Sequence, residues 1–97
     1  MIKFDNVTLE GDKVRVGGPI TAEEDLLRRV SFILVQPGVV VEGEGEIRAG
    51  AWAGAADAAG LQPGPVTAVG VSVFVDTSRG PTVETRTWSE TLELAGS

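Results

Sequence analysis

Short clusters of glycine and proline divide this chain into brief segments, and each segment has the character of a β-strand. Short strand-like segments between turn residues are typical of antiparallel sandwiches and barrels, so the sequence predicts an all-β protein. The clusters lie at Gly11-Asp12, Gly17-Gly18-Pro19, Pro37-Gly38, Gly60, Pro63-Gly64-Pro65 and Arg79-Gly80-Pro81.

The segments between the turns show the patterns expected of strands. The first runs over residues 2–9, and its apolar phase slips near Asp5-Asn6, which predicts a bulge or kink. Residues 30–36 are almost continuously apolar and predict a central strand. Residues 66–76 place alternate valines on one face, and these valines are expected to pack one sheet against another. Further strands are predicted at residues 13–16, 39–48, 51–55 and 82–94.

Two segments fit this pattern less well. Thr21 and Glu24 have the spacing of a capping box, which predicts one or two helical turns within residues 22–29. Oppositely charged residues four positions apart, Glu24 with Arg28 and Asp25 with Arg29, favour the same turns. The Ala/Gly tract that contains Trp52 is interpreted as a thin strand, with a short helix as the alternative.

One stretch resembles a known family. Residues 61–71, LQPGPVTAVGV, resemble the turn and strand near the end of fibronectin type III domains, with Leu61, Pro63 and Gly64 in register. Thr67 stands where that family has a tyrosine, so the tyrosine's hydrogen-bonded corner would be missing. At 97 residues the chain has the length of a single domain, predicted over residues 1–97. The resemblance implies that this domain is an antiparallel β-sandwich of about seven strands of the immunoglobulin or fibronectin III type.

Composition narrows the range of partners. The 97-residue chain has a formal net charge of -6, which disfavours nucleic acids and anionic membrane surfaces. It lacks cysteine, a signal-peptide pattern and an apolar run long enough to span a membrane, so a cytoplasmic location is expected. A domain taken from a longer secreted chain would have the same features. The bias towards Ala, Gly and Val suggests a GC-rich bacterial genome.

The residue inventory argues against an enzyme. His, Cys and Tyr are all missing, which removes the commonest general base and the best nucleophile. We therefore predict no catalytic residue, no cofactor and no metal. Alternating Glu42, Glu44 and Glu46 would line one face of a strand, either as a solvated face or as a docking surface for a basic partner. Arg48 or Arg86 could pair with them across strands.

Other side chains are weaker candidates. Trp52 is either a core residue or an exposed anchor that binds a partner or stacks on a sugar, and Trp88 is the more exposed of the two tryptophans by its neighbours. Four oxygen-bearing residues near the first strand could serve calcium, although ordinary turn chemistry explains them as well. They are Asp5, Asn6, Glu10 and Asp12.

These observations lead to a functional hypothesis. The chain is predicted to be a non-enzymatic protein-interaction or structural module, which binds a protein partner or associates with itself through its first or last strand. The first alternative is a small-ligand module that binds carbohydrate through Trp52 or Trp88. The second is a small enzyme that uses the row of glutamates.

Overall fold

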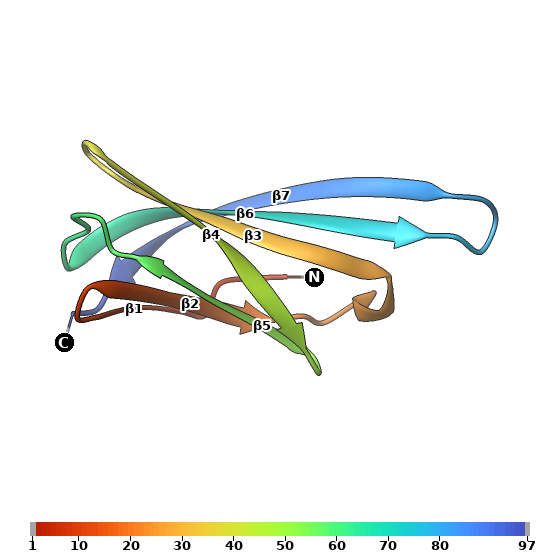
Figure 1. The fold of residues 1–97 in the computed structure, drawn as a ribbon, viewed down its shortest axis with the longest axis horizontal. Helices are drawn as coiled ribbons and strands as arrows, with labels where there is room; N and C mark the ends of the chain where they lie inside the picture. The colour runs from red at the N-terminus through yellow and green to blue at the C-terminus, as the bar shows by residue number, and fades with distance from the viewer. Residues whose placement is uncertain (1, 97) are drawn as a thin grey trace.

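The computed structural model describes residues 2–96, which form one antiparallel sheet of seven strands (Figure 1). The strands are β1 (Asn6–Glu10), β2 (Lys13–Pro19), β3 (Leu27–Gln36), β4 (Val39–Arg48), β5 (Ala51–Asp57), β6 (Gly64–Asp76) and β7 (Thr82–Leu94). Their order across the sheet is β1-β2-β5-β4-β3-β6-β7. Each predicted strand is present, including the thin strand of the Ala/Gly tract, so the all-β prediction is confirmed.

The sheet curls because β4 changes its neighbour part-way along its length. Residues 39–45 of β4 pair with β3, whereas residues 45–48 pair with β5, so Gly45 belongs to both ladders. As a result β1, β2 and β5 lie in one layer and β3, β6 and β7 in the other, with β4 crossing between them (Figure 1). The sequence predicted two separate sheets; the structure has one continuous sheet whose two arms face each other.

The two ends of the curled sheet meet at one point. Thr8 and Ala95 form a parallel bridge, and the Leu9 amide donates a hydrogen bond to the Ala95 carbonyl over 2.8 Å.

The predicted irregularity near Asp5-Asn6 is also present. Asn6 pairs with Gly17 and Ile2 with Ile20, so residues 3–5 on one side oppose residues 18 and 19 on the other. The extra residue is a bulge that lets both Phe4 and Val7 point into the core.

Four aromatic rings fill the space between the two arms. The rings of Phe4 and Trp52 lie 5.4 Å apart, those of Phe4 and Trp88 also 5.4 Å, and those of Phe32 and Trp52 6.3 Å. Aliphatic side chains from all seven strands surround them, although β7 contributes only Leu92 and Leu94. The core is therefore more aromatic at its centre than five aromatic residues in 97 would suggest.

The inner side of β6 differs from the prediction. Its buried side chains are Val66, Ala68, Ser72 and Phe74, with the bare backbone of Gly70 between them. The alternating valines of the same strand point to the outer side and are only partly buried. The prediction that these valines pack two sheets together is wrong, because the bulky core aromatics need small partners on the inner side.

The predicted helical turns reduce to one short 3₁₀ turn, η1 (Glu24–Leu26). Thr21 is not its N-cap; Glu23 is, in a left-handed conformation and without a side-chain cap hydrogen bond. The Glu24 carboxylate instead accepts a hydrogen bond from the Gly50 amide at 2.7 Å. Leu27 already begins β3, because strand pairing with β6 takes precedence over the local charge pattern.

A side chain also fixes the turn that precedes β6. Leu61 is buried, and the Gln36 side-chain amide donates to the carbonyls of Gln62 and Pro65 while its oxygen accepts from the Gln62 amide. This end of β3 is thereby tied to the start of β6. Among residues 2–96, no helix has the length and apolar character needed to cross a membrane.

Candidate functional site

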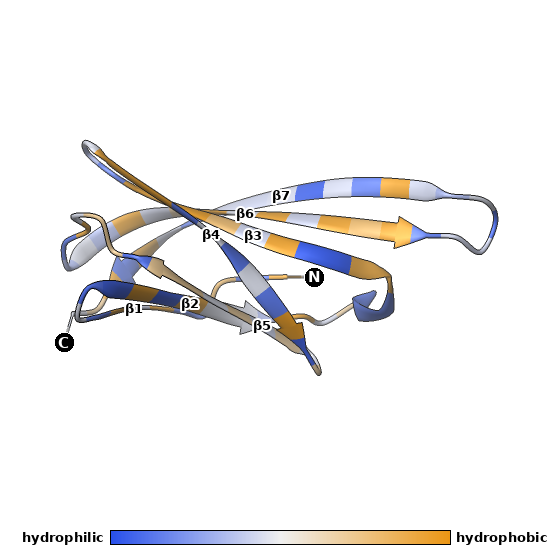
Figure 2. Ribbon diagram, viewed as in Figure 1, coloured by the Kyte–Doolittle hydropathy of each residue, from blue (hydrophilic) through white to orange (hydrophobic). Residues whose placement is uncertain are grey.

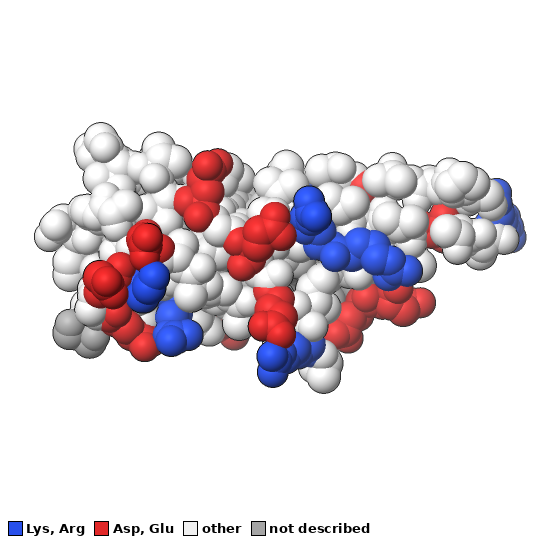
Figure 3. Space-filling view, in the orientation of Figure 1, with Lys and Arg blue, Asp and Glu red and all other residues white. Residues whose placement is uncertain are grey.

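The outer side of β4 carries the row of acidic side chains predicted from the sequence. Glu42, Glu44 and Glu46 are all exposed, and they alternate with residues that face the core. Figure 3 shows acidic side chains spaced along the course of β4, and Figure 2 shows the same strand as alternating hydrophilic and paler bands. The prediction that one strand face carries all three carboxylates is confirmed.

Core packing explains why glycine separates these glutamates. A Cβ atom on Gly43 would lie 2.4 Å from Cζ of Phe32, and one on Gly45 would lie 2.6 Å from Cε3 of Trp52. Neither distance can be accommodated without movement of an aromatic ring. The Gly-Glu alternation therefore has two causes. The inner side of β4 needs glycine because the aromatic rings lie against its backbone, and the outer side carries the charged glutamates.

The partners of the glutamates differ in part from those predicted. Glu46 pairs at 2.6 Å with Arg48, which was predicted as a partner across strands but lies on the same strand, and Glu44 lies 3.7 Å from Arg29 of the neighbouring strand. These pairs are solvent-exposed on both sides, so each contributes little to stability. They leave the carboxylates accessible to a partner.

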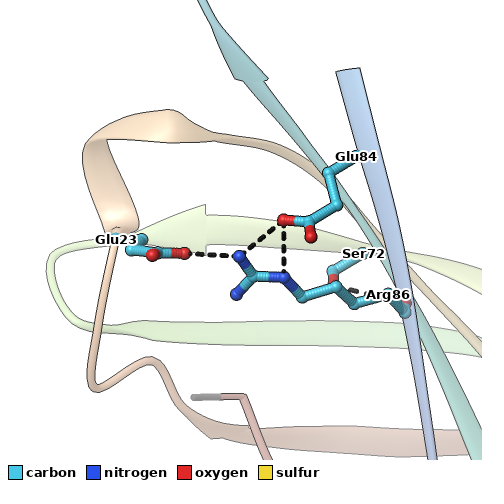
Figure 4. A network of polar contacts seen from close by, with 4 residues as sticks. All are labelled: Glu23, Ser72, Glu84 and Arg86. Carbon is cyan, nitrogen blue, oxygen red and sulfur yellow. Dashed lines mark hydrogen bonds and ion pairs between the residues drawn. The ribbon is translucent and has the colours of Figure 1, made fainter. Parts of the chain in front are cut away.

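Arg86 lies elsewhere, on the inner side of β7 (Figure 4). Its guanidinium contacts Glu84 at 2.6 Å and Glu23 at 2.8 Å, and it covers the ring of Phe74 at 4.3 Å from the centroid. The hydrogen bonds to Glu84, with a smaller contribution from Glu23, raise the pKa of Arg86 above its ordinary value. This network fastens the η1 turn to the β6–β7 hairpin, a role that sequence spacing did not reveal.

Beside the acidic row lies an exposed apolar surface, which we name the valine face. Three of its side chains are strongly exposed: Val35 at 37%, Val40 at 62% and Val83 at 66%. The ladders place the others beside them on the same outer side, partly buried, and Figure 3 shows a largely uncharged surface over β6 and β7. The valine face comprises Ile33, Val35, Val40, Val69, Val71, Val73, Val75 and Val83.

Uncharged hydroxyl side chains extend the valine face across the last strand. Thr85, Thr87, Ser89 and Thr91 alternate along the outer side of β7; the first three lie opposite valines of β6, and Thr91 lies opposite Thr67. Sequence reasoning missed this surface because it assigned the same valines to the core. The signal that could have revealed it is the alternate set of β6, in which glycine, serine and alanine leave room for large rings.

The two tryptophans are both part of the aromatic core. Trp52 is 2% exposed, and its indole N–H donates to the Lys3 carbonyl at 3.1 Å. Trp88 is partly buried, its ring lies against Gly70, and the ring of Phe4 is 5.4 Å away at a tilt of 39°. Among residues 2–96, its buried indole N–H has no hydrogen-bond partner. Trp52 is thus a core residue, and Trp88 packs against the same aromatic cluster while remaining partly exposed.

The four residues considered for calcium are divided between different partners. The Asp5 carboxylate accepts a hydrogen bond from Asn6, while Glu10 pairs with Arg15 at 3.0 Å. Asp12 lies in the turn after β1, and its carbonyl accepts from the Ala58 amide. Within residues 2–96, no group of three or more acidic side chains is arranged to hold a metal ion.

Comparisons with protein-family models, with curated proteins and with solved structures give no match to this chain. The resemblance of residues 61–71 to fibronectin type III domains therefore stays a prediction.

Proposed function

We propose that this chain is a non-enzymatic protein-interaction module that binds a partner protein through the valine face and the adjoining acidic row. The observation that carries the proposal is the exposure of three large aliphatic side chains on the outer side of the sheet, Val35 and Val40 at one end and Val83 at the other end of a row of partly buried valines. Apolar patches of this kind on soluble proteins usually mark interaction sites. Serine and threonine along β7 add hydrogen-bonding groups at the border.

The charge of the surface indicates the kind of partner. Glu42 and Glu44 stand at the β4 border of the valine face, where Arg29 pairs with Glu44. A partner with an apolar centre and a basic rim complements this arrangement, because opposite charges at a rim speed encounter and fix orientation. The absence of His, Cys and Tyr from the chain supports a binding role over catalysis.

We also propose that the fold is of the immunoglobulin or fibronectin III type. In these sandwiches one sheet groups strands A, B and E, and the other groups C, F and G with C′ beside C. Here the order is β1-β2-β5 followed by β4-β3-β6-β7, which is the same grouping when the strands are lettered along the chain. Sandwiches of this kind often serve as binding or assembly units, which agrees with the proposed function.

A peptide-display selection tests the docking surface and does not require that the natural partner be identified. Peptides selected from an unbiased library should be rich in apolar residues with flanking Lys or Arg. Their binding should shift the amide resonances of Val69, Val71 and Val73, and added salt should weaken it. Val71→Glu should weaken binding at least about tenfold, because it puts an unpaired charge in the centre of the contact.

The matched control is Ala55→Glu, which adds the same charge at an exposed position of β5, in the other layer. It should leave the affinity of the selected peptides within about twofold of the original. Peptides that bind equally well to Val71→Glu, or that map to β1, β2 and β5, would contradict the proposal.

A further inference from the structure

The strand at one end of the sheet, β7, has an unusually open edge. It is 13 residues long and its backbone pairs with β6 on one side only; the N-terminal end of the sheet contacts it near Ala95, and the Phe4 amide donates to the Glu90 carboxylate at 3.0 Å. Residues 82–87 are exposed without interruption. A free strand edge presents backbone N–H and C=O groups that can pair with another strand.

Several of the usual features that protect such an edge are missing from β7. The β6–β7 ladder runs from Gly64–Leu94 to Asp76–Thr82 without a shift in register, so no bulge bends the strand away. The strand contains neither proline nor lysine. Its charged side chains at positions 84, 86 and 90 point to the inner side, and such inward charges normally oppose edge pairing.

The direction of the edge groups follows from Ala95. Both its amide and its carbonyl bond to β1, at Val7 and Leu9, so they point away from β6. Backbone groups alternate in direction along a strand, and the unbroken ladder carries this alternation back to Thr82. The N–H and C=O groups of Val83, Thr85 and Thr87 therefore point outward.

We propose that β7 pairs antiparallel with β7 of a second copy of this chain, about a two-fold axis at Thr85. In such a pair the residues directly opposite each other have side chains on the same face of the sheet. The two-fold axis must therefore lie between one residue and the same residue of the second copy. With the axis at Thr85, Glu84 of each copy stands opposite Arg86 of the other. Val83 stands opposite Thr87, and the two Thr85 residues exchange backbone hydrogen bonds.

Neighbouring registers are less favourable on charge. An axis at Glu84 sets Glu84 against itself, and one at Arg86 sets Arg86 against itself. An axis at Thr87 opposes Glu84 to Glu90. An axis at Trp88 pairs Arg86 with Glu90 but extends to Leu94, where β1 already closes the sheet beside Ala95. Thr85 is thus the register in which the inward charges of β7 attract, with each Glu84 opposite an Arg86, instead of preventing pairing.

Pairing at Thr85 would join the sheets of two copies into one. The outer side would carry the valine faces of both copies with Val83 and threonine at the centre, an uncharged seam between two chains that each carry a net charge of -6. Val83 belongs both to this seam and to the valine face, but the pairing depends on the backbone edge of β7, so loss of dimerisation and loss of peptide binding are separate outcomes.

Sedimentation equilibrium of the full chain tests the pairing. The unsubstituted chain should be a concentration-dependent dimer. Thr85→Pro should weaken dimerisation about tenfold or more, because it removes the outward N–H from both central hydrogen bonds while leaving the ladder to β6 intact. Thr85→Ala, the control, keeps that N–H and should remain a dimer. Circular dichroism verifies that each variant is folded.

A charge exchange tests the register itself. Glu84→Arg alone should dissociate the dimer because like charges then face each other, and so should Arg86→Glu. An equimolar mixture of these two variants should form a heterodimer, since every cross-strand pair is again opposite in charge. A monomer at millimolar concentration, a dimer unaffected by Thr85→Pro, or a mixture that does not associate would overturn the proposal.

Discussion

The indole ring of Trp88 lies directly against the backbone of Gly70, its partner across the β6–β7 ladder. A Cβ atom at position 70 would lie 2.1 Å from Cζ2 of that ring. The same relationship recurs between Gly43 and Phe32 and between Gly45 and Trp52. An aromatic ring that packs on the backbone of a strand glycine is thus a repeated feature of this core. The ring shields the backbone that glycine leaves uncovered.

Gly70→Ala should therefore destabilise the protein by about 1–3 kcal/mol, the usual cost of forcing an extra methyl group into a packed core. Urea denaturation measures this free energy. Adding Trp88→Phe should recover part of the loss, so the double-mutant cycle should show a coupling above about 0.5 kcal/mol. Ala55→Ser, at an exposed site of β5, is the control and should change stability by less than about 0.5 kcal/mol. Additive effects at positions 70 and 88 would contradict the packing described.

Trp52→Phe should destabilise the fold by about 1–3 kcal/mol, because the Lys3 carbonyl loses the indole donor that approaches it at 3.1 Å. Fluorescence quenching verifies the burial independently. The Trp88→Phe protein, in which Trp52 is the remaining tryptophan, should resist quenching by iodide. The Trp52→Phe protein reports on the partly buried Trp88 and should be quenched more strongly. Equal quenching of the two would contradict the assignment of Trp52 to the core.

The strands were predictable because turn residues mark their ends and because alternation is a local property. Even the bulge near Asp5-Asn6 shows in the sequence, since Phe4 and Val7 are out of phase. The way in which β4 joins the two layers into one continuous sheet was not predictable. β5 follows β4 after a two-residue turn, but the position at which β4 leaves β3 for β5 also depends on β2, which is distant in sequence and pairs with the other edge of β5.

The candidate site was predictable only in its acidic half. Glu42, Glu44 and Glu46 stand out because charge on one strand face implies exposure. The valine face was not predictable, because valine suits the inner and outer sides of a strand equally by hydrophobicity. What decides between the sides is the volume of Trp88 and Phe32 across the core, and a single-strand pattern does not contain that information.

The turn between β6 and β7 provides a prediction on pH. The Asp76 carboxylate accepts hydrogen bonds from the hydroxyl of Ser78 at 2.7 Å and from its amide at 2.9 Å, and these bonds lower the pKa of Asp76 below its ordinary value of 3.8. A lowered folded-state pKa means that the stabilisation is complete above the ordinary value and is lost as pH falls through the lowered one.

Carbon-13 NMR titration of the Asp76 carboxyl group measures this pKa directly. Ser78→Ala should raise the pKa of Asp76 towards the ordinary range, because it removes the hydroxyl donor. Asp57 serves as the internal control: its pKa is also lowered, but through its hydrogen bond to Lys13 on the opposite side of the fold, so Ser78→Ala should not change it. A titration of Asp76 that is the same in both proteins would show that the hydroxyl contributes nothing.

The direction in which the β6 valines point can be tested with one isosteric change at two sites. Threonine has the shape of valine but carries a hydroxyl group, and burying that group without a partner costs about 1–3 kcal/mol. Val66, at 1% exposure, faces the core, so Val66→Thr should lower the free energy of unfolding by that amount. Val71 belongs to the outer side, where water reaches the hydroxyl, so Val71→Thr should change stability by less than about 0.5 kcal/mol. If Val71→Thr were the more damaging change, the alternating valines would form the core after all, and the exposed surface on which the proposed function depends would not exist.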